Sequence, residues 1–322
     1  MPKVLFYAGR SNPTTEVMIQ QAPAGWNVVL VDPAITPEGE QLKLVADADF
    51  IWLYGGKPSD AVLRAGKKVK LLQLSSAGYD NINVALAGEL GIPVANASGT
   101  NAEGVAELAV TLMLSVYRHL IRIDNETRNG QWLTDNSSGT NSFEVLNKTV
   151  GIVGLGNIGG TVAKLLRGFD PKLLYYDVVA KPEIEKRTGA TRTGLDELLE
   201  QSDIVTLHVP LTSRTRHMIG KRELGLMKPS AILINTCRGP VVDEAALHDA
   251  LVAGRIWGAG LDVFEIEPVL KDNPILKLEN VVVAPHAAGK TAESYPRRAR
   301  FSFDNMQRVL SGRPALNIVT PS

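Results

Sequence analysis

Residues 149–165 read Thr-Val-Gly-Ile-Val-Gly-Leu-Gly-Asn-Ile-Gly-Gly-Thr-Val-Ala-Lys-Leu, and no other stretch of the chain carries as much structural information. The apolar run at 150–153 is typical of a buried parallel strand, and the pattern after the glycines is typical of an amphipathic helix. Gly154 allows a tight turn, Gly156 lets backbone amides approach a pyrophosphate, and Gly159 lets the helix pack closely on the strand. The stretch therefore predicts a strand, a phosphate-binding turn and a helix whose positive dipole end faces the phosphates.

A second predicted strand, Leu173–Tyr176, is followed by Asp177, about 20 residues after the last glycine of the turn. An acidic residue at this place can accept hydrogen bonds from the hydroxyls of the adenosine ribose. A G-x-G-x-x-G pattern alone is weak, but strand, turn, helix, strand and acid in this order predict a dinucleotide site. Asp177 followed by Val178 favours NAD over NADP, because the carboxylate would repel a 2′-phosphate. The nearby cations Lys181 and Arg187 leave NADP as the alternative.

The length and composition of the chain limit the classes to which it can belong. Its 322 residues are enough for about two domains, and 44% hydrophobic and 21% charged residues are ordinary for an α/β protein. Because 34 basic residues balance 34 acidic ones, no basic field favours nucleic acid or an anionic membrane as a partner. We see no membrane span, signal peptide or transit sequence. The single cysteine, Cys237, fits a reducing compartment, so we expect a cytoplasmic protein, and we predict no metal site.

Short β-like runs alternate with helical patterns from the first residues onward, which is typical of parallel sheets covered on both faces. The predicted strands are 4–7, 28–31, 50–54, 71–74 and 92–95 in a first series, and 150–153, 173–176, 204–208, 231–235, 258–263 and 281–284 in a second. We therefore expect two doubly wound parallel-sheet α/β domains. A Rossmann dinucleotide-binding domain at 100–289 would be inserted into a flavodoxin-like domain formed by 1–99 and 290–322.

Two further stretches have clear patterns. A helical pattern runs from Ala102 to about Asn129, with Asn101 as the expected N-cap and Glu103 in the first turn. The polar segment from Asn129 to Asn147 is predicted to be an extended arm. The tail from 293 to 310 has a helical pattern.

Three segments place polar residues just after predicted strands, where ligands bind in open α/β sheets. They are 233–244 with Arg238, 260–268 with Asp262, Glu265 and Glu267, and 281–289 with His286. Each has an ordinary alternative: an arginine paired with an acid, a solvated loop carboxylate, or a loop histidine.

Together these residues supply the groups that reduce a 2-oxo acid once a hydride-transfer cofactor is bound. Histidine donates and accepts a proton near neutral pH, and a carboxylate beside it favours the imidazolium. Arginine can grip a carboxylate through two hydrogen bonds and polarise a carbonyl. We therefore predict hydride transfer from a nicotinamide to carbon and proton transfer from His286 to oxygen.

The chain resembles the D-isomer-specific 2-hydroxyacid dehydrogenase family along nearly its whole length. The motifs that carry the resemblance are the glycine turn, the three segments above, and Ser75–Ile82, Val105–Glu107 and His208–Thr212. The resemblance implies an NAD-dependent enzyme that interconverts a small 2-oxo acid and a D-2-hydroxy acid, with a substrate-binding domain made of both chain ends. The family's members are usually homodimers through the nucleotide domain. The helix from Asn101 and the arm around Trp132 would then be dimer contacts.

The resemblance also implies roles for individual residues. Arg238 would bind the substrate carboxylate and carbonyl, and His286 would be the acid/base. Glu267 would be its partner, since it directly precedes a proline and Glu265 does not. The implied cofactor contacts are Gly154, Gly156, Asn157, Ile158, Gly159, Asp177, His208, Pro210, Thr215, Thr236, Cys237, Arg238, Asp262, His286 and Gly289. The implied substrate contacts are Ser76, Ala77, Gly78, Asn101, Arg238 and His286.

Departures from the family pattern leave the substrate open. Lys57 replaces a more usual residue type in a loop of the first domain, and Arg297, Arg298 and Arg300 cluster on the tail helix. These cations would meet a second anionic group of the substrate, or they are surface charges. Two other functions stay open: a dinucleotide-sensing protein of the co-repressor type, and phosphite oxidation with the same three side chains. Formate oxidation fits less well, because it uses glutamine in place of the glutamate.

Overall fold

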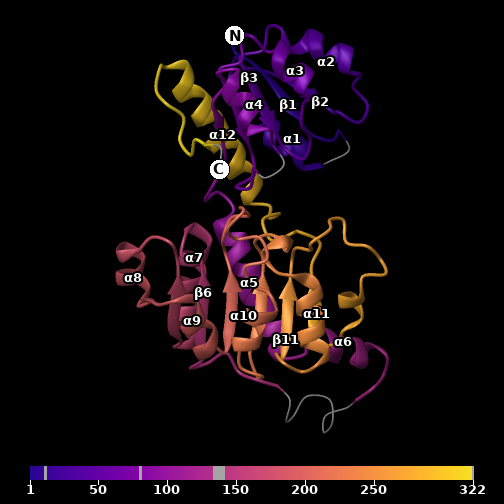
Figure 1. The fold of residues 1–322 in the computed structure, drawn as a ribbon. Coiled ribbons are helices and arrows are strands. Elements are labelled where there is room, and N and C mark those ends of the chain that lie inside the picture. The colour runs from indigo at the N-terminus through magenta and orange to yellow at the C-terminus, as the bar shows by residue number, and fades with distance from the viewer. Residues whose placement is uncertain (11–12, 80–81, 133–141, 321–322) are drawn as a thin grey trace. The chain divides into compact units, whose positions relative to one another are not determined.

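The computed structural model describes residues 1–10, 13–79, 82–132 and 142–320, and the chain divides into two units (Figure 1). Unit 1 contains Met1–Asn101 and Lys290–Ser322, and unit 2 contains Ala102–Gly289. Both chain ends therefore contribute to one unit, while the middle of the chain forms the other.

Unit 1 is built on a five-stranded parallel sheet in the order β2-β1-β3-β4-β5. Its strands are β1 (Lys3–Tyr7), β2 (Asn27–Val31), β3 (Phe50–Leu53), β4 (Leu71–Leu74) and β5 (Val94–Ala95). Every residue of β3 and β4 is buried, because helices cover both faces of the sheet. This strand order is the flavodoxin-like one, so the predicted fold class is confirmed for this unit.

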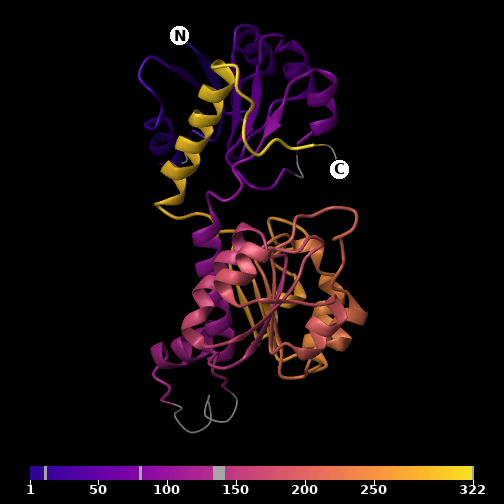
Figure 2. The same ribbon diagram turned by 90° about the vertical axis from the view of Figure 1, so that its left-hand side faces the viewer.

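The helices of unit 1 form a layer on each side of the sheet. They are α1 (Pro13–Ile19), α2 (Glu38–Val45), α3 (Asp60–Ala65), α4 (Val84–Glu89) and α12 (Ser294–Leu310). α12 comes from the end of the chain and lies along the sheet (Figure 2). There Trp52 stacks on Phe6 with ring centroids 3.9 Å apart, and Phe303 of α12 meets Trp52 edge-on. On the other face, Val45 of α2 and Val62 of α3 belong to a second apolar cluster.

Unit 2 is built on a seven-stranded parallel sheet in the order β12-β11-β10-β9-β6-β7-β8. Its strands are β6 (Thr149–Val153), β7 (Lys172–Tyr176), β8 (Thr191–Arg192), β9 (Ile204–Leu207), β10 (Ile232–Asn235), β11 (Gly258–Leu261) and β12 (Val281–Val283). This is the Rossmann strand order with one added strand, so the predicted Rossmann fold is confirmed for this unit. The order reverses between β6 and β9, which is where such sheets bind dinucleotides.

Helices also cover both faces of this second sheet (Figure 2). The helices are α5 (Ala102–Tyr117), α6 (Leu120–Arg128), α7 (Asn157–Leu166), α8 (Pro182–Thr188), α9 (Leu195–Gln201), α10 (Lys221–Leu226) and α11 (Glu244–Val252), with 3-10 turns at Arg167–Phe169, Gly239–Val241 and Pro274–Lys277. Met113 of α5 and Val162 of α7 share one apolar cluster with Ile152 of β6. Leu198 of α9 and Leu247 of α11 belong to the cluster on the opposite face.

The single helix predicted from 102 to 129 is wrong. The structure has two helices, α5 and α6, which are bent by 64° at their junction. His119 stands between them with a φ of 48°, in the left-handed region where helices commonly end. Within the described parts of the chain, no single helix has the length and apolar composition to cross a membrane. Among the same residues, only the bent pair α5 and α6 has that length and composition, when the two helices are taken together.

Other local predictions also need correction. Asn101 does not cap α5 through its side-chain oxygen, which is buried and has no hydrogen-bond partner among the described residues. The edge strand β8, at Thr191–Arg192, was missed because two residues carry no alternating pattern. The predicted strand 258–263 ends at Leu261. Residues 133–141 of the predicted arm lie outside the described residues.

Two glycines allow backbones to meet at the point where the strand order of unit 2 reverses. A Cβ at Gly159 would lie 2.1 Å from the carbonyl oxygen of Gly154, and a Cβ at Gly154 would lie 2.6 Å from the carbonyl oxygen of His208. Gly154 also has a φ of 96°, which favours glycine. The N-terminus of α7 is thereby held close to β6 and β9.

Replacing Gly159 with alanine should destabilise the protein, because the backbone of Gly154 has to move away from the new methyl group. Overpacking of this kind costs about 1–3 kcal/mol. The measurement is urea-induced unfolding followed by circular dichroism. Gly225→Ala on α10 is the matched control, since a Cβ there meets no atom within 4 Å. A loss of stability that is equal in the two variants would contradict the packing explanation.

Candidate active site

The turn that carries Arg238 is organised by Asn235, the last residue of β10. Asn235 Oδ1 accepts hydrogen bonds from the amide and the thiol of Cys237, both at 3.1 Å, and Nδ2 donates to the carbonyl of Arg238 at 3.0 Å. Nη1 of Arg238 donates to the carbonyl of Cys237 at 2.7 Å. Asn235 is 1% exposed, so its side chain finds its partners inside the protein. The sequence analysis did not single out Asn235, although a polar residue at the end of a buried strand was a signal.

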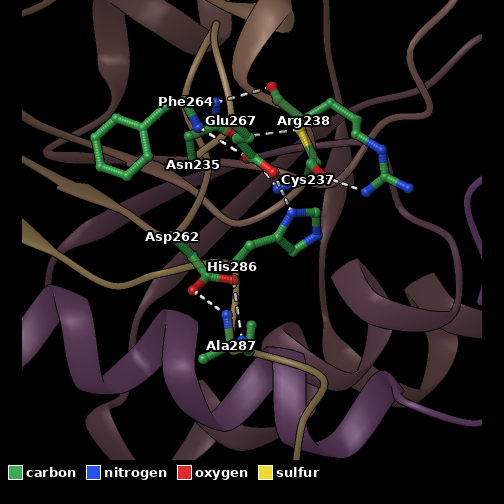
Figure 3. A network of polar contacts seen from close by, with 9 residues as sticks. Asn235, Cys237, Arg238, Asp262, Phe264, Glu267, His286 and Ala287 are labelled. Atoms are coloured by element: carbon green, nitrogen blue, oxygen red, sulfur yellow. Dashed lines mark hydrogen bonds and ion pairs between the residues drawn. The ribbon is translucent and has the colours of Figure 1, made fainter. Parts of the chain in front are cut away.

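Glu267 and His286 form a hydrogen-bonded pair beside Arg238 (Figure 3). Nδ1 of His286 lies 2.6 Å from Oε2 of Glu267, and Oε1 of Glu267 accepts a hydrogen bond from the Phe264 amide at 3.0 Å. The carboxylate is therefore fixed at both oxygens. Because Nδ1 faces Glu267, Nε2 is the ring nitrogen on the other side of the imidazole.

Asp262 anchors the segment that carries His286. It is fully buried, and its carboxylate accepts hydrogen bonds from the amides of Ala287 at 2.7 Å and Ala288 at 3.0 Å. Its carbonyl accepts from the His286 amide at 2.7 Å. His286 has a φ of 51°, an uncommon conformation for this residue type, and these three hydrogen bonds hold it.

Close backbone packing brings the loop of Glu267 against the turn of Arg238. A Cβ at Gly239 would lie 1.8 Å from the carbonyl oxygen of Phe264, a distance that no side chain tolerates. Only glycine at this position lets the two segments approach so closely. Gly239 was another residue that the sequence analysis did not single out.

A second histidine–carboxylate pair joins the loop of Glu267 to the segment between β9 and α10. Nε2 of His217 is 2.8 Å from Oε1 of Glu265, while the amide of Glu265 donates to Glu244 at 2.9 Å. The structure therefore brings Glu267, and not Glu265, to His286. His217 and Glu265 offer a matched comparison for that first pair.

Burial and hydrogen bonds set the protonation states of this region. Burial raises the pKa of Glu267, but the hydrogen bonds from His286 and Phe264 and the charge of Arg238 outweigh it, so the net pKa lies below its ordinary value. Burial lowers the pKa of His208 to about 3 and raises that of Cys237 to about 11. His208 and the Cys237 thiol are therefore neutral near pH 7. Among the described residues, no group of three or more His, Cys, Asp or Glu is arranged to hold a metal ion.

The glycine turn fits a dinucleotide. The N-cap of α7 is Gly156, which offers no side-chain cap, and the positive end of the helix dipole at this point favours an anion. Two buried polar atoms lie just after neighbouring strands of this sheet: Nδ1 of His208 after β9 and Oγ1 of Thr236 after β10. Neither atom has a hydrogen-bond partner among the described residues. Buried polar atoms normally have partners, so a ligand at the carboxyl edge of this sheet would complete them. Thr215 Oγ1 donates to the carbonyl of Pro210 at 2.6 Å and so shapes the loop after β9.

Asp177 follows β7, as predicted, and its carboxylate is fixed by the backbone. Oδ2 accepts from the Leu155 amide at 2.9 Å, and Oδ1 accepts from the Val179 amide at 3.1 Å. The acid thus ties the end of β7 to the glycine turn. Arg192, which the sequence analysis missed, lies beside it: Nη2 donates to the carbonyl of Asp177 at 2.9 Å.

The predicted substrate contacts Ser76, Ala77, Gly78 and Asn101 belong to unit 1 and follow β4 or precede α5. Ser76 Oγ donates to the Gly78 carbonyl at 2.7 Å, and Asn96 Nδ2 donates to the Ala77 carbonyl at 2.7 Å. These bonds fix the loop after β4. Residues 80–81 of the same motif lie outside the described residues.

The cations noted on unit 1 have different surroundings. Nε of Arg297 donates to the Thr100 carbonyl at 2.7 Å, whereas Arg298 is buried with its guanidinium 5.8 Å from the ring centroid of Tyr295. Nη1 of Arg300 lies 3.5 Å from Oε1 of Gln21. Lys57 lies in the loop after β3. These contacts of the three arginines of α12 go to three different groups.

Known proteins resemble this chain closely. The family model "D-isomer specific 2-hydroxyacid dehydrogenase, NAD binding domain" matches residues 110–288. A glyoxylate reductase of Korarchaeum cryptofilum is 42% identical over 280 residues, which cover 86% of this chain and 84% of the relative. A D-lactate dehydrogenase of Aquifex aeolicus, solved with NAD and lactic acid, has a TM-score of 0.81 and 31% identity, covering 99% of this chain and 100% of that one. An NADPH-dependent glyoxylate/hydroxypyruvate reductase of Sinorhizobium meliloti, solved with NADP and malonate, has a TM-score of 0.83 and 29% identity, covering 99% and 97%.

Proposed function

Because this chain belongs to the D-isomer-specific 2-hydroxyacid dehydrogenase family, whose members are oxidoreductases acting on CH–OH donors, we propose that it reduces a small 2-oxo acid to the D-2-hydroxy acid with NADH. The observation that carries this proposal is the His286–Glu267 pair, with Nδ1 and Oε2 2.6 Å apart and Arg238 beside it. Those side chains supply an acid/base, a partner that fixes it, and a cation for the substrate.

The nicotinamide cofactor, when bound, supplies the hydride. His286 donates the proton to the developing alkoxide from Nε2, since Nδ1 faces Glu267. Glu267 favours the imidazolium form of His286 before the proton is transferred, and it fixes the orientation of the ring. Arg238 binds the substrate carboxylate and polarises the carbonyl, while Asp262 holds the backbone of the acid/base segment.

Each unit has its own set of proposed ligand contacts. The proposed substrate contacts on unit 1 are Ser76, Ala77, Gly78 and Asn101. On unit 2 the dinucleotide would be held by Gly154, Gly156, Asn157, Ile158, Gly159, Asp177, His208, Pro210, Thr215, Thr236, Cys237, Asp262 and Gly289. The support is the glycine turn without a side-chain cap and the unpartnered buried atoms of His208 and Thr236.

We propose NAD as the preferred cofactor and glyoxylate or hydroxypyruvate as the first substrates to test. The Asp177 carboxylate favours ribose hydroxyls and opposes a 2′-phosphate. Two of the relatives named above are a glyoxylate reductase and a glyoxylate/hydroxypyruvate reductase by their names. A small substrate also matches a site whose polar groups lie on adjacent strand ends.

His286→Ala should lower the rate of glyoxylate or hydroxypyruvate reduction about 10²–10⁴-fold, because the general acid is lost. Binding of NADH, measured by its fluorescence, should be nearly unchanged. NADH oxidation at 340 nm measures the rate. His217→Ala, which removes the other paired histidine, is the matched control and should have little effect. Turnover of the His286 variant at the rate of the unmodified enzyme would rule out the acid/base role.

Glu267→Gln should shift the pH dependence of the reaction. Glu267 is ionised throughout the neutral range because its pKa is lowered, and its charge favours the imidazolium that reduction needs. Without that charge, the reduction rate should fall at a lower pH, and oxidation of the hydroxy acid should begin at a correspondingly lower pH. The measurement is kcat/KM against pH in both directions. Glu265→Gln is the control, and an equal shift in both variants would contradict the pairing.

We also propose that unit 2 forms a homodimer through α6 and the segment that follows it. No residue of α6 is buried by the described part of the chain. Its apolar side chains Leu120 and Ile121 are 48% and 53% exposed. Trp132 is 80% exposed just beyond the helix. An apolar surface of this kind is typical of a protein interface, and a second copy would cover it.

Light scattering after size exclusion should give twice the chain mass of 34.7 kDa. Ile121→Glu places a charge in the proposed interface and should shift the protein to monomer, because an unpaired buried charge is costly. Val252→Glu on α11, where the valine is 63% exposed, is the matched control and should stay dimeric. A monomeric parent protein, or a dimer that survives Ile121→Glu, would refute this interface.

A further inference from the structure

Arg192 lies next to the residue that would select the cofactor. It is the second residue of the edge strand β8, which pairs in parallel with β7 so that Arg192 stands opposite Tyr175. From there its side chain reaches past the end of β7. Nη2 is 2.9 Å from the carbonyl oxygen of Asp177 and 3.4 Å from that of Val178. The guanidinium is thus fixed at the two residues that follow the strand.

The carboxylate of Asp177 is turned toward backbone amides. Its two oxygens accept from Leu155 at 2.9 Å and from Val179 at 3.1 Å. Amide hydrogen bonds of this kind balance part of the negative charge on a carboxylate. The end of β7 therefore carries an acid held by two amides and, beside its backbone, the guanidinium of Arg192.

The other cations considered from the sequence are placed differently. Nε of Arg187 donates to the carbonyl of Glu183 within its own helix, α8. Lys181 begins that helix, and its backbone amide donates to the hydroxyl of Tyr175. Val178 is 71% and Val179 59% exposed, so the surface of this turn is open to a ligand.

We propose that Arg192 forms a binding site for the 2′-phosphate of NADP(H), so that the protein accepts this cofactor in addition to NAD(H). The inference rests on the proposed dinucleotide site, and it adds a phosphate-binding residue to it. An arginine near the ribose acid is the usual means by which this fold accommodates a 2′-phosphate. A planar guanidinium can turn two N–H groups to phosphate oxygens while retaining a contact to the backbone.

The test compares two ligands that differ only in the 2′-phosphate. Calorimetric titration of the full-length protein with ADP and with 2′,5′-ADP measures binding without turnover. Arg192→Gln should weaken 2′,5′-ADP about tenfold or more, because a charge-assisted hydrogen bond is lost, and should leave ADP nearly unchanged. Arg187→Gln, a neighbouring arginine on α8, is the matched control and should change neither affinity. The ratio of kcat/KM for NADPH to that for NADH should fall in parallel in the Arg192 variant.

Three other binding results would overturn the role of Arg192, and a fourth would refute the dinucleotide site. An equal loss for both ligands would show that Arg192 only holds the turn, and it would overturn the inference. Unchanged 2′,5′-ADP binding in the variant, or ADP binding without any 2′,5′-ADP binding in the parent protein, would overturn it as well. Failure of the parent protein to bind either ligand would refute the proposed dinucleotide site itself, and the inference with it.

Discussion

The position of His286 depends on Asp262, a fully buried acid at the end of β11. Its carboxylate accepts from the amides of Ala287 and Ala288, and its carbonyl accepts from the amide of His286. Burial raises the pKa of Asp262, so the charged form is costly there, and the two amide hydrogen bonds offset only part of that cost. One residue thereby fixes three consecutive amides, including that of a histidine in a left-handed conformation that costs roughly 1–2 kcal/mol.

Arg238 and Glu267 lie in the same region as His286 because three neighbouring strands, β10, β11 and β12, end at the same edge of the sheet. Arg238 follows β10, and Glu267 follows β11. The absence of a side chain at Gly239 lets the Phe264 carbonyl lie where a Cβ would otherwise be. This contact places the loop of Glu267 on the turn of Arg238, so backbone packing, rather than flexible side chains, assembles the group.

Sequence reasoning predicted the parts of this structure that leave periodic or motif-like signals. The alternation of strands and helices predicted the two doubly wound sheets, and the glycine motif predicted the turn between β6 and α7. It also placed Asp177 after β7. The misses have a different origin. The break at His119 depends on one residue's φ, and β8 is too short for a pattern. Arg192 comes to Asp177 only through that pairing, so no motif around Asp177 could reveal it.

Burial distinguishes the two histidines that follow strands at this edge of the sheet. The Nδ1 of His208 is buried without a hydrogen-bond partner in the described structure, and desolvation lowers the pKa of this histidine to about 3. It stays neutral under physiological conditions and can serve only as a hydrogen-bonding group. The side chain of His286 is 46% exposed, and its Nδ1 lies 2.6 Å from the Glu267 carboxylate, so its ring is accessible to solvent and held by an acid. The two side chains are chemically the same, and the difference in their surroundings supports the proposed role of His286 in proton transfer.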